Sequence, residues 1–354
     1  VSLEGQIRWK QQTILEQMRR LGQCELDSVT VHRMNTDEAA RGLHWRTRIE
    51  ALIDEQGRPI MRRRGTHTRV PITTMPLASQ ALLAVADKHN VWNGRFKPED
   101  RIRIAVPQPR TIINHDETQT LLNAVGDNYA IIANGKLAEG KQLLQEKVIV
   151  QNHEFNYNVD ASGFWQMHKQ APIALTNHVI TQVQQYFANN SPRNGVGKPI
   201  IWDLYSGSGL FTIPLAILGA GENTNTQARM LSIEGANIAV HNARKNLQNY
   251  DLQDTVETRI GDVAKTLATL NPNADIARPD VVVLDPPRAG AKAKVCKQIA
   301  QSGARMIVYI ACDITSLARD TATLQSLGYA VQDVQAFDIY PQTHHVETVA
   351  VFVK

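Results

Sequence analysis

The chain has 354 residues, a formal net charge of +4 and three cysteines. It has no apolar run of the roughly 20 residues that a membrane-spanning helix needs, and no secretory leader pattern is visible, which excludes a membrane protein and a disulfide-rich secreted domain. Cys24, Cys296 and Cys312 are too scattered for a closed zinc site, so a reducing, cytoplasmic setting is expected.

The first element is a basic helix. In residues 5–21 apolar side chains recur at near-helical spacing and Gly22 supplies a stop, which predicts a helix within an N-terminal segment 1–27. Short alternating runs broken by Gly and Pro follow, as in RIRIAVP at 101–107, and predict a smaller β-rich domain over 28–160 with one helix at about 77–89.

Strand-like and helix-like segments alternate over residues 161–354. This pattern predicts an α/β fold, a Rossmann-like doubly wound sheet whose ligands bind at the carboxyl ends of its strands. The last two strand candidates are separated by too few residues for a helical crossover, so they are expected to form an antiparallel hairpin. The strand candidates are 199–205, 229–234, 255–260, 280–285, 305–311, 330–340 and 344–353.

A Gly-rich turn follows the first of these strands. In DLYSGSGLF (203–211), Gly207 and Gly209 let the backbone approach a ligand and enter a helix. Thr212 stands where a dinucleotide fingerprint has its third glycine, which disfavours a nicotinamide site. Glu234 ends the next strand and suits the ribose hydroxyls of an adenosyl group, and Asp262 ends the third strand and could meet the adenine amino group. Each acid alone is more often a helix cap or a solvated strand end.

Four further residues carry chemistry. Asp285 and Arg288, in DPPR after an apolar strand, lie where cofactor and substrate should meet, because two prolines force a rigid exit from that strand. Cys312 at one strand end and Glu347 in the last strand suggest a nucleophile and a base. In isolation a buried apolar cysteine and an exposed strand glutamate are the commoner interpretations.

The order of the motifs resembles a known family. The segments are FWQMH (164–168), DLYSGSGLF, SIEGANIAVHNARKN, DPPRAG, YIACDITSLARD and YPQTHHVETVAVF. Together they are similar to the 5-methyluridine RNA methyltransferases, which act on C5 of uracil in tRNA or rRNA. The resemblance implies S-adenosylmethionine as methyl donor, Cys312 attacking C6 of uracil, and Glu347 removing the proton from C5. It also implies cofactor contacts at Gln166, Tyr205, Glu234 and Asp285, beside the Gly207 turn.

The front part of the chain is expected to hold RNA. Residues 1–110 hold 19 of the 38 Lys and Arg and 12 of the 34 Asp and Glu, a net charge of +7, whereas the remaining 244 residues carry −3. Arg62, Arg63 and Arg64, and Trp45 among further arginines, suit phosphate contact and base stacking. A solvated surface strand pair would look similar. The target uridine must leave its stack to reach Cys312.

The sequence departs from the family pattern at several positions, and two other functions compete with the predicted uracil methylation. Met75 stands about where some members have the fourth cysteine of an iron–sulfur cluster, so no cluster is expected. Asp313 and Ile314 replace a frequent Asn-Pro after the nucleophile. DPPR also resembles the motif of amino-group methyltransferases, although these prefer an aromatic residue where Arg288 stands. An inactive RNA-binding protein of the same fold is the second alternative. No membrane and no obligate protein partner is inferred.

Overall fold

The computed structural model describes residues 2–63, 65–109, 118–193, 197–221 and 227–354. The chain divides into two compact units. The first comprises residues 1–38, 149–155 and 172–354, and the second comprises 39–148 and 156–171. The units have other bounds than the domains predicted at 1–27, 28–160 and 161–354. The cause is strand pairing over long sequence separation, because Thr30–Arg33 joins the sheet of the first unit by pairing with residues 335–338.

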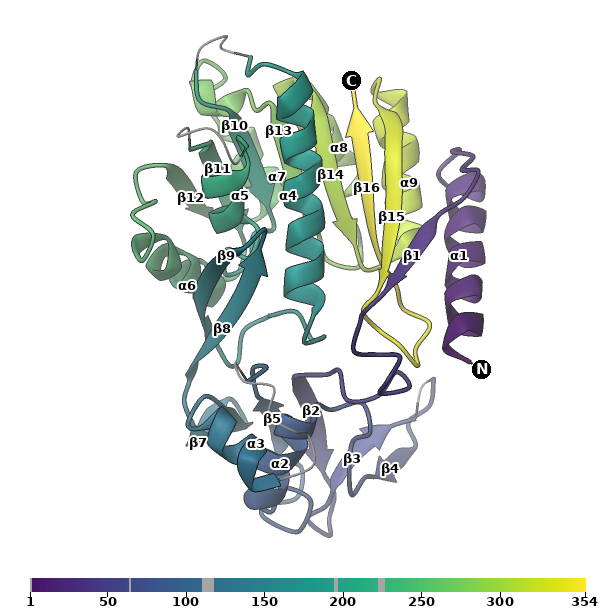
Figure 1. Ribbon diagram of the computed structural model, residues 1–354, viewed down its shortest axis with the longest axis vertical. Coiled ribbons are helices and arrows are strands. Elements are labelled where there is room, and N and C mark those ends of the chain that lie inside the picture. Colours follow the sequence, from purple (N-terminus) through teal and green to yellow (C-terminus); the bar gives the residue numbers. More distant parts are fainter. Residues whose placement is uncertain (1, 64, 110–117, 194–196, 222–226) are drawn as a thin grey trace. The chain divides into compact units, whose positions relative to one another are not determined.

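Within the described residues, the first unit contains an eight-stranded mixed sheet in the order β1-β15-β16-β14-β13-β10-β11-β12. Neighbouring strands are parallel except β16, which is antiparallel to both β14 and β15 (Figure 1). The predicted doubly wound fold and C-terminal hairpin are thereby confirmed. The strands are β1 Thr30–Arg33, β10 Ile200–Leu204, β11 Arg229–Glu234, β12 Val256–Ile260, β13 Val281–Leu284, β14 Met306–Ala311, β15 Ala330–Asp338 and β16 Glu347–Val353.

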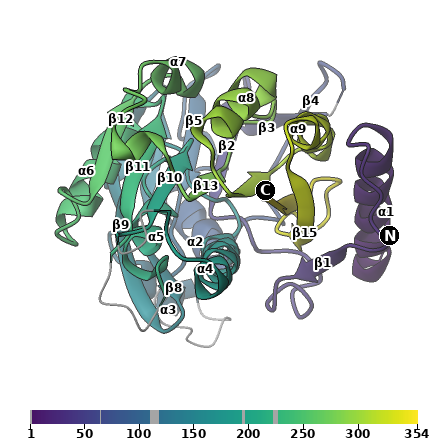
Figure 2. The same ribbon diagram turned by 90° about the horizontal axis from the view of Figure 1, so that it is seen from above.

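Helices cover both faces of this sheet (Figure 2). One face carries α1, α7, α8 and α9, whose buried side chains share a single hydrophobic core with the strands. The other face carries α4 and α5. β10, β13 and β14 are buried at every position, as expected for central parallel strands. The helices are α1 Leu3–Arg20, α4 Ala171–Asn189, α5 Thr212–Leu218, α6 Asn237–Gln248, α7 Val263–Ala268, α8 Lys292–Ser302 and α9 Ile314–Ser326, with a 3₁₀ turn at Asp275–Ala277.

The second unit is built on an antiparallel six-stranded sheet, counted over its described residues, in the order β4-β3-β2-β5-β6-β7. Two helices accompany it, one of which was predicted. The elements are β2 Arg48–Ile53, β3 Pro59–Arg62, β4 Arg69–Pro71, α2 Gln80–Lys88, β5 Arg101–Ala105, α3 Thr118–Val125, β6 Ala130–Ala133 and β7 Lys136–Gly140. A separate hairpin, β8 Leu143–Val150 and β9 His153–Asp160, turns through Gln151 and Asn152, both at positive φ as a two-residue hairpin loop requires.

Candidate active site

The sheet of the first unit brings the predicted nucleophile and base to one edge. Asp285 and Cys312 directly follow β13 and β14, which are parallel neighbours. Glu347 opens β16, which runs antiparallel to β14, with Thr348 paired to Ala311. Because Ala311 precedes Cys312, the cysteine and the glutamate lie side by side at the carboxyl edge. Ligands of open α/β sheets bind at this edge.

The Gly-rich turn after β10 is held by the carboxylate of Glu234. Tyr205 and Gly207 have φ of +62° and +57°, and the Tyr205 N–H donates to Ile233 O at 2.8 Å. The Gly207 N–H donates to Glu234 Oε2 at 3.0 Å, and the Ala236 N–H donates to Oε1 at 2.7 Å. A Cβ on Gly207 would meet no described atom within 4 Å. The turn therefore presents open backbone, and each Glu234 oxygen keeps a lone pair for a ligand.

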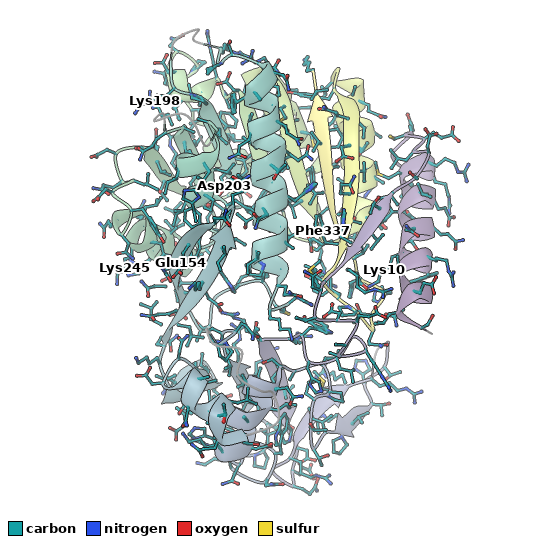
Figure 3. All side chains as sticks on the ribbon, in the orientation of Figure 1. Lys10, Glu154, Lys198, Asp203, Lys245 and Phe337 are labelled. Atoms are coloured by element: carbon teal, nitrogen blue, oxygen red, sulfur yellow. The ribbon has the colours of Figure 1, made fainter. Side chains whose placement is uncertain are left out.

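Three carboxyl groups gather beneath this turn. Asp203, which is labelled in Figure 3, is 1% exposed. Its Oδ2 accepts a hydrogen bond from the Thr212 hydroxyl at 2.5 Å, and its Oδ1 has no hydrogen-bond partner among the described residues. Burial raises the pKa of Asp203 to about 7, and the charges of Asp285 and Glu234 act in the same direction. Burial, followed by the charge of Glu234, also raises the pKa of Asp285 to about 7. Such a cluster suits a positively charged ligand.

The pKa values of Cys312 and Glu347 are both raised, chiefly by burial. Burial raises the pKa of the Cys312 thiol to about 12, the charges of Glu347 and Asp285 add to the rise, and Arg288 opposes it. Glu347 is 2% exposed. Burial and the charge of Asp285 raise its pKa well above the usual range, and a hydrogen bond with the Tyr340 side chain opposes that rise. The thiol is therefore protonated at neutral pH and must lose its proton before it can act as a nucleophile.

The segment between the last two strands contributes side chains that sequence reasoning missed. Arg288 is exposed, and its Nη2 lies 3.5 Å from His345 Nε2. The His345 ring meets the Tyr340 ring edge-on, with centroids 6.0 Å apart. Tyr340 and His345 both precede Glu347 in YPQTHHVE (340–347), and their nearness in sequence to the predicted base could have indicated a role in the site.

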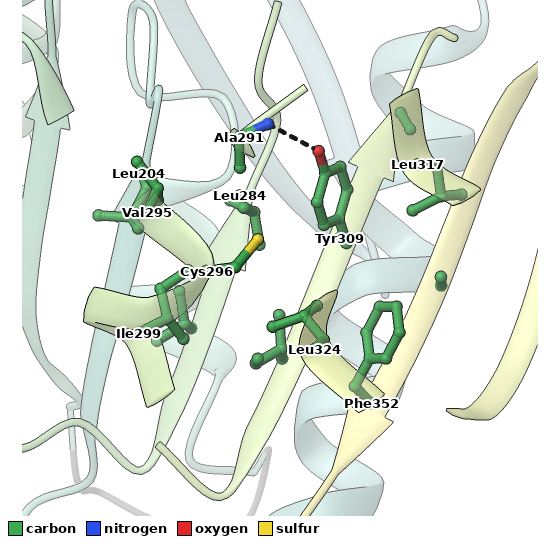
Figure 4. Packing of buried hydrophobic residues seen from close by; sticks show 14 of the residues in the cluster. Leu204, Leu284, Ala291, Val295, Cys296, Ile299, Tyr309, Leu317, Leu324 and Phe352 are labelled. Carbon is green, nitrogen blue, oxygen red and sulfur yellow. Dashed lines mark hydrogen bonds between the residues drawn. The ribbon is translucent and has the colours of Figure 1, made fainter. Parts of the chain in front are cut away.

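A buried polar network fixes the exit of the DPPR segment. The Ala291 N–H donates to the Tyr309 hydroxyl at 2.9 Å (Figure 4). The Lys292 N–H and the Tyr309 hydroxyl both donate to Asp320 Oδ2, at 3.1 and 2.7 Å. Gly290, at φ +78°, packs so closely that a Cβ would lie 2.6 Å from that oxygen. The segment that carries Asp285 and Arg288 is thus tied to β14 and α9, which flank Cys312.

All of the predicted cofactor contacts remain predictions, and two of them lie outside the geometry described above. Asp262 is exposed and caps α7 by accepting the Lys265 N–H at 2.9 Å, which is the alternative role that the sequence allowed. Gln166 is buried in the second unit, so it is no part of the geometry described for the first.

The predicted RNA contacts divide into exposed and buried residues. Arg62 and Arg63 are exposed at the end of β3, and Arg64 lies outside the described residues. The expectation that Trp45 stacks on a base is wrong, because its ring is 1% exposed and stacks on His168 at 5.6 Å between centroids. Arg48 is likewise buried and forms an ion pair with Glu146 at 2.7 Å. Local sequence spacing did not reveal this burial.

Over the described ranges, no group of three His, Cys, Asp or Glu side chains could hold a metal ion. None of the helices in the part of the chain that the structure describes is long and apolar enough to cross a membrane.

Comparison with known proteins identifies the family. A sequence model of the family described as tRNA (uracil-5-)-methyltransferase matches residues 122–354. An uncharacterised RNA methyltransferase of Bifidobacterium longum is 54% identical over 100% of this chain and 77% of its own length. Another, from Streptomyces coelicolor, is 32% identical over 98% of this chain and 73% of its own length. The chain therefore belongs to the tRNA (uracil-5-)-methyltransferase family.

A solved structure supports the fold. The Pyrococcus abyssi tRNA (uracil-54, C5)-methyltransferase, in complex with S-adenosyl-L-homocysteine, superimposes with a TM-score of 0.65 at 19% identity, over 98% of this chain and 83% of that chain. Family membership confirms the predicted enzyme class, an RNA (uracil-C5) methyltransferase, and disfavours the amino-group alternative.

Proposed function

We propose that the chain transfers a methyl group from S-adenosylmethionine to C5 of a uridine in tRNA or rRNA, with Cys312 as nucleophile and Glu347 as base. The observation that carries this proposal is the pairing of β14 with β16, which sets the thiol and the carboxyl side by side at the strand edge beside Asp285. Neither side chain alone would distinguish an active site from ordinary packing.

The residues around the Gly-rich turn fit the cofactor. The open backbone at Gly207 leaves room for a ligand, and the unpaired Oδ1 of Asp203 lies within a cluster of acids. In the first unit, Tyr205, Gly207, Glu234, Asp262 and Asp285 would hold the group. When bound, S-adenosylmethionine supplies an electrophilic methyl group on a positively charged sulfur.

Cys312 activates the uracil ring. Its thiol loses a proton to water, its sulfur bonds to C6, and the electrons of the C5–C6 double bond move to the O4 enolate, which makes C5 nucleophilic. After C5 has been methylated, Glu347 takes the C5 proton. The electrons of that C–H bond restore the C5–C6 double bond, and the C6–S bond breaks to release Cys312 as thiolate.

The ionisation of the two groups matches these roles. A glutamate with a raised pKa binds a proton more tightly than an exposed one, as a base acting near neutral pH requires. Arg288 is the positive group that opposes the high pKa of Cys312. Its exposed guanidinium therefore has two proposed tasks, promoting thiolate formation and meeting the RNA.

The RNA is held by basic side chains beyond the reacting atoms. Arg62 and Arg63 are exposed at the end of β3, and Arg64 follows them in the sequence. Arginine side chains in such positions bind phosphates without reading sequence. The uridine must be flipped or lie in a single-stranded loop to reach Cys312.

The test is a covalent trap. RNA carrying 5-fluorouridine at its uridines is incubated with the protein and S-adenosylmethionine, because fluorine at C5 cannot leave as a proton does. We expect a protein–RNA adduct that survives denaturation in the wild type and is absent from Cys312→Ala. Methylation by Cys312→Ala, with no adduct in the wild type, would contradict the proposal. Cys24→Ala is the matched control, since Cys24 is buried and has no proposed role.

A further inference from the structure

The buried face of α1 is polar at its N-terminal end. Gln6, Lys10, Ile14 and Met18 are its buried residues, and their spacing of four aligns them in one row. Ile14 and Met18 join the hydrophobic core. Gln6 and Lys10 do not, although both are buried. The family model matches residues 122–354 and does not cover α1, so the match assigns no role to Gln6 or Lys10.

Lys10 reaches the segment that precedes the predicted base. The Nζ atom of Lys10, a residue labelled in Figure 3, lies 2.5 Å from Asp338 Oδ1, with both side chains fully buried. It donates a second hydrogen bond to Tyr340 O at 3.1 Å. Burial lowers the pKa of Lys10, while Asp338 and Asp37 act to raise it. A buried ion pair is often no more stabilising than apolar side chains of similar volume. We therefore consider the Lys10–Asp338 pair for its effect on the position of the backbone at residues 338–340.

Gln6 contacts the same segment two residues beyond Tyr340, at Gln342. Its Nε2 donates to Gln342 Oε1 at 3.1 Å, and its Oε1 accepts the Gln342 N–H at 2.8 Å. Gln342 has φ of +62°, a conformation that a side chain other than glycine rarely adopts without support. Residues 339–346 are thus tied to α1 through Asp338, the Tyr340 carbonyl and Gln342.

This segment leads directly to the base. Phe337, the residue before Asp338, pairs with Glu347 across β15 and β16. The Tyr340 side chain bonds to the Glu347 carboxyl. The contacts of Lys10 and Gln6 therefore fix the backbone around Tyr340, whose side chain bonds to the Glu347 carboxyl group.

We propose that Lys10, assisted by Gln6, is a positioning residue that holds Tyr340 against Glu347 and so sets the base for removal of the C5 proton. This role rests on the proposed function, in which Glu347 acts after methyl transfer. It makes α1 part of the structure that positions the base.

If residues 339–346 are no longer tied to α1, removal of the C5 proton by Glu347 should slow, and the pH profile of turnover should shift. Without the Tyr340 bond, the pKa of Glu347 rises further, so the rising limb of the turnover rate moves to higher pH. The addition of Cys312 to C6 should change little. The charged and titratable groups that face Glu347 are Asp285, Cys312 and Tyr340, with Arg288 and His345 beyond them.

The experiment compares three variants in the full chain. Lys10→Met/Asp338→Leu removes both charges together, so that no buried charge is left unpaired. Gln6→Ala removes only the contact to Gln342. Lys245→Met removes an exposed lysine on α6, and is the control (Figure 3). Each is assayed for unfolding midpoint, for adduct with 5-fluorouridine RNA, and for methylated adduct and turnover with unmodified RNA.

We expect the double variant to trap 5-fluorouridine RNA as the wild type does, but to lose roughly 10- to 100-fold in turnover, the scale on which misplacement of a catalytic group acts. Methylated adduct should accumulate, and the rising pH limb should shift to higher pH. Gln6→Ala should show the same pattern more weakly, and Lys245→Met should match the wild type.

Wild-type turnover in a folded double variant would overturn the positioning role. Lost turnover without methylated adduct would also overturn it, because the fault would then precede Glu347. If the double variant unfolds, Gln6→Ala decides by the same two criteria. Absence of any adduct from the wild type is a different result, since it would reject the proposed function itself.

Discussion

Tyr309 donates its hydroxyl to Asp320 Oδ2 at 2.7 Å, and this bond connects the strand that ends at Cys312 to the helix that follows it. The same oxygen accepts the Lys292 N–H at 3.1 Å. The buried carboxylate of Asp320 therefore fixes the DPPR segment, the strand that ends at Cys312 and α9 relative to one another. The geometry of the site depends on this network as well as on the reacting groups.

Gly290→Ala should disturb the hydrogen-bond network around Asp320. An added Cβ would lie 2.6 Å from the Asp320 oxygen, at a backbone φ of +78°. We expect urea unfolding to show a loss of about 1–3 kcal/mol, with slower adduct formation. Gly94→Ala is the control, because φ is +73° there but no described atom lies within 4 Å. An equal loss of stability in both variants, with normal adduct formation, would show that the close contact is unimportant.

The affinity for S-adenosylmethionine should fall below about pH 7. Burial raises the pKa values of Asp203 and Asp285 to about 7, so both lose negative charge as the pH drops through that value, and the positively charged sulfur loses attraction. Titration calorimetry between pH 8 and pH 6 should show a decline of up to about tenfold per group for each pH unit. S-adenosylhomocysteine, whose sulfur is neutral, should show a weaker dependence. Identical profiles for the two ligands would contradict this.

The apparent pKa of Cys312 should follow its neighbours' charges. Burial is the largest cause of the rise of its pKa to about 12, Glu347 adds to that rise and Arg288 reduces it. Alkylation rates between pH 7 and pH 11, read at the Cys312 peptide by mass spectrometry, should give a lower apparent pKa in Glu347→Gln and a higher one in Arg288→Met. Opposite shifts would mean that the charges act through structural change.

Arg62→Ala/Arg63→Ala should weaken RNA binding at low salt and reduce its salt dependence. Each lost phosphate contact should lower the slope of log affinity against log salt by about 1. Lys136→Met provides the control, since Lys136 is an exposed lysine of β7 in the same unit. If the double variant keeps the wild-type slope, these arginines do not contact phosphate.

The sequence was sufficient for the doubly wound sheet because its central strands are continuous apolar runs between turn residues. β11 was predicted with the observed bounds, and β10, β13 and β14 within one residue at each end. β1 was missed as part of that sheet, because its partner, β15, lies some 300 residues further along the chain. Pairing over such a separation leaves no local periodicity.

The reacting pair could be predicted from the motifs, but its surroundings could not. Nothing in the sequence indicated that Trp45 is buried against His168, or that Lys10 pairs with Asp338. Both contacts depend on which side of an element faces the core. An arginine-flanked tryptophan therefore suggested a base contact, where the structure shows packing.

The most direct test of the central claim is the intact mass of Glu347→Gln after incubation with S-adenosylmethionine and unmodified substrate RNA. The account predicts a species equal to protein plus RNA plus one methyl group, whose RNA-linked peptide contains Cys312, because the C5 proton cannot be removed and the C6–S bond cannot break. Multiple turnover by this variant with free methylated RNA and no such species would contradict it.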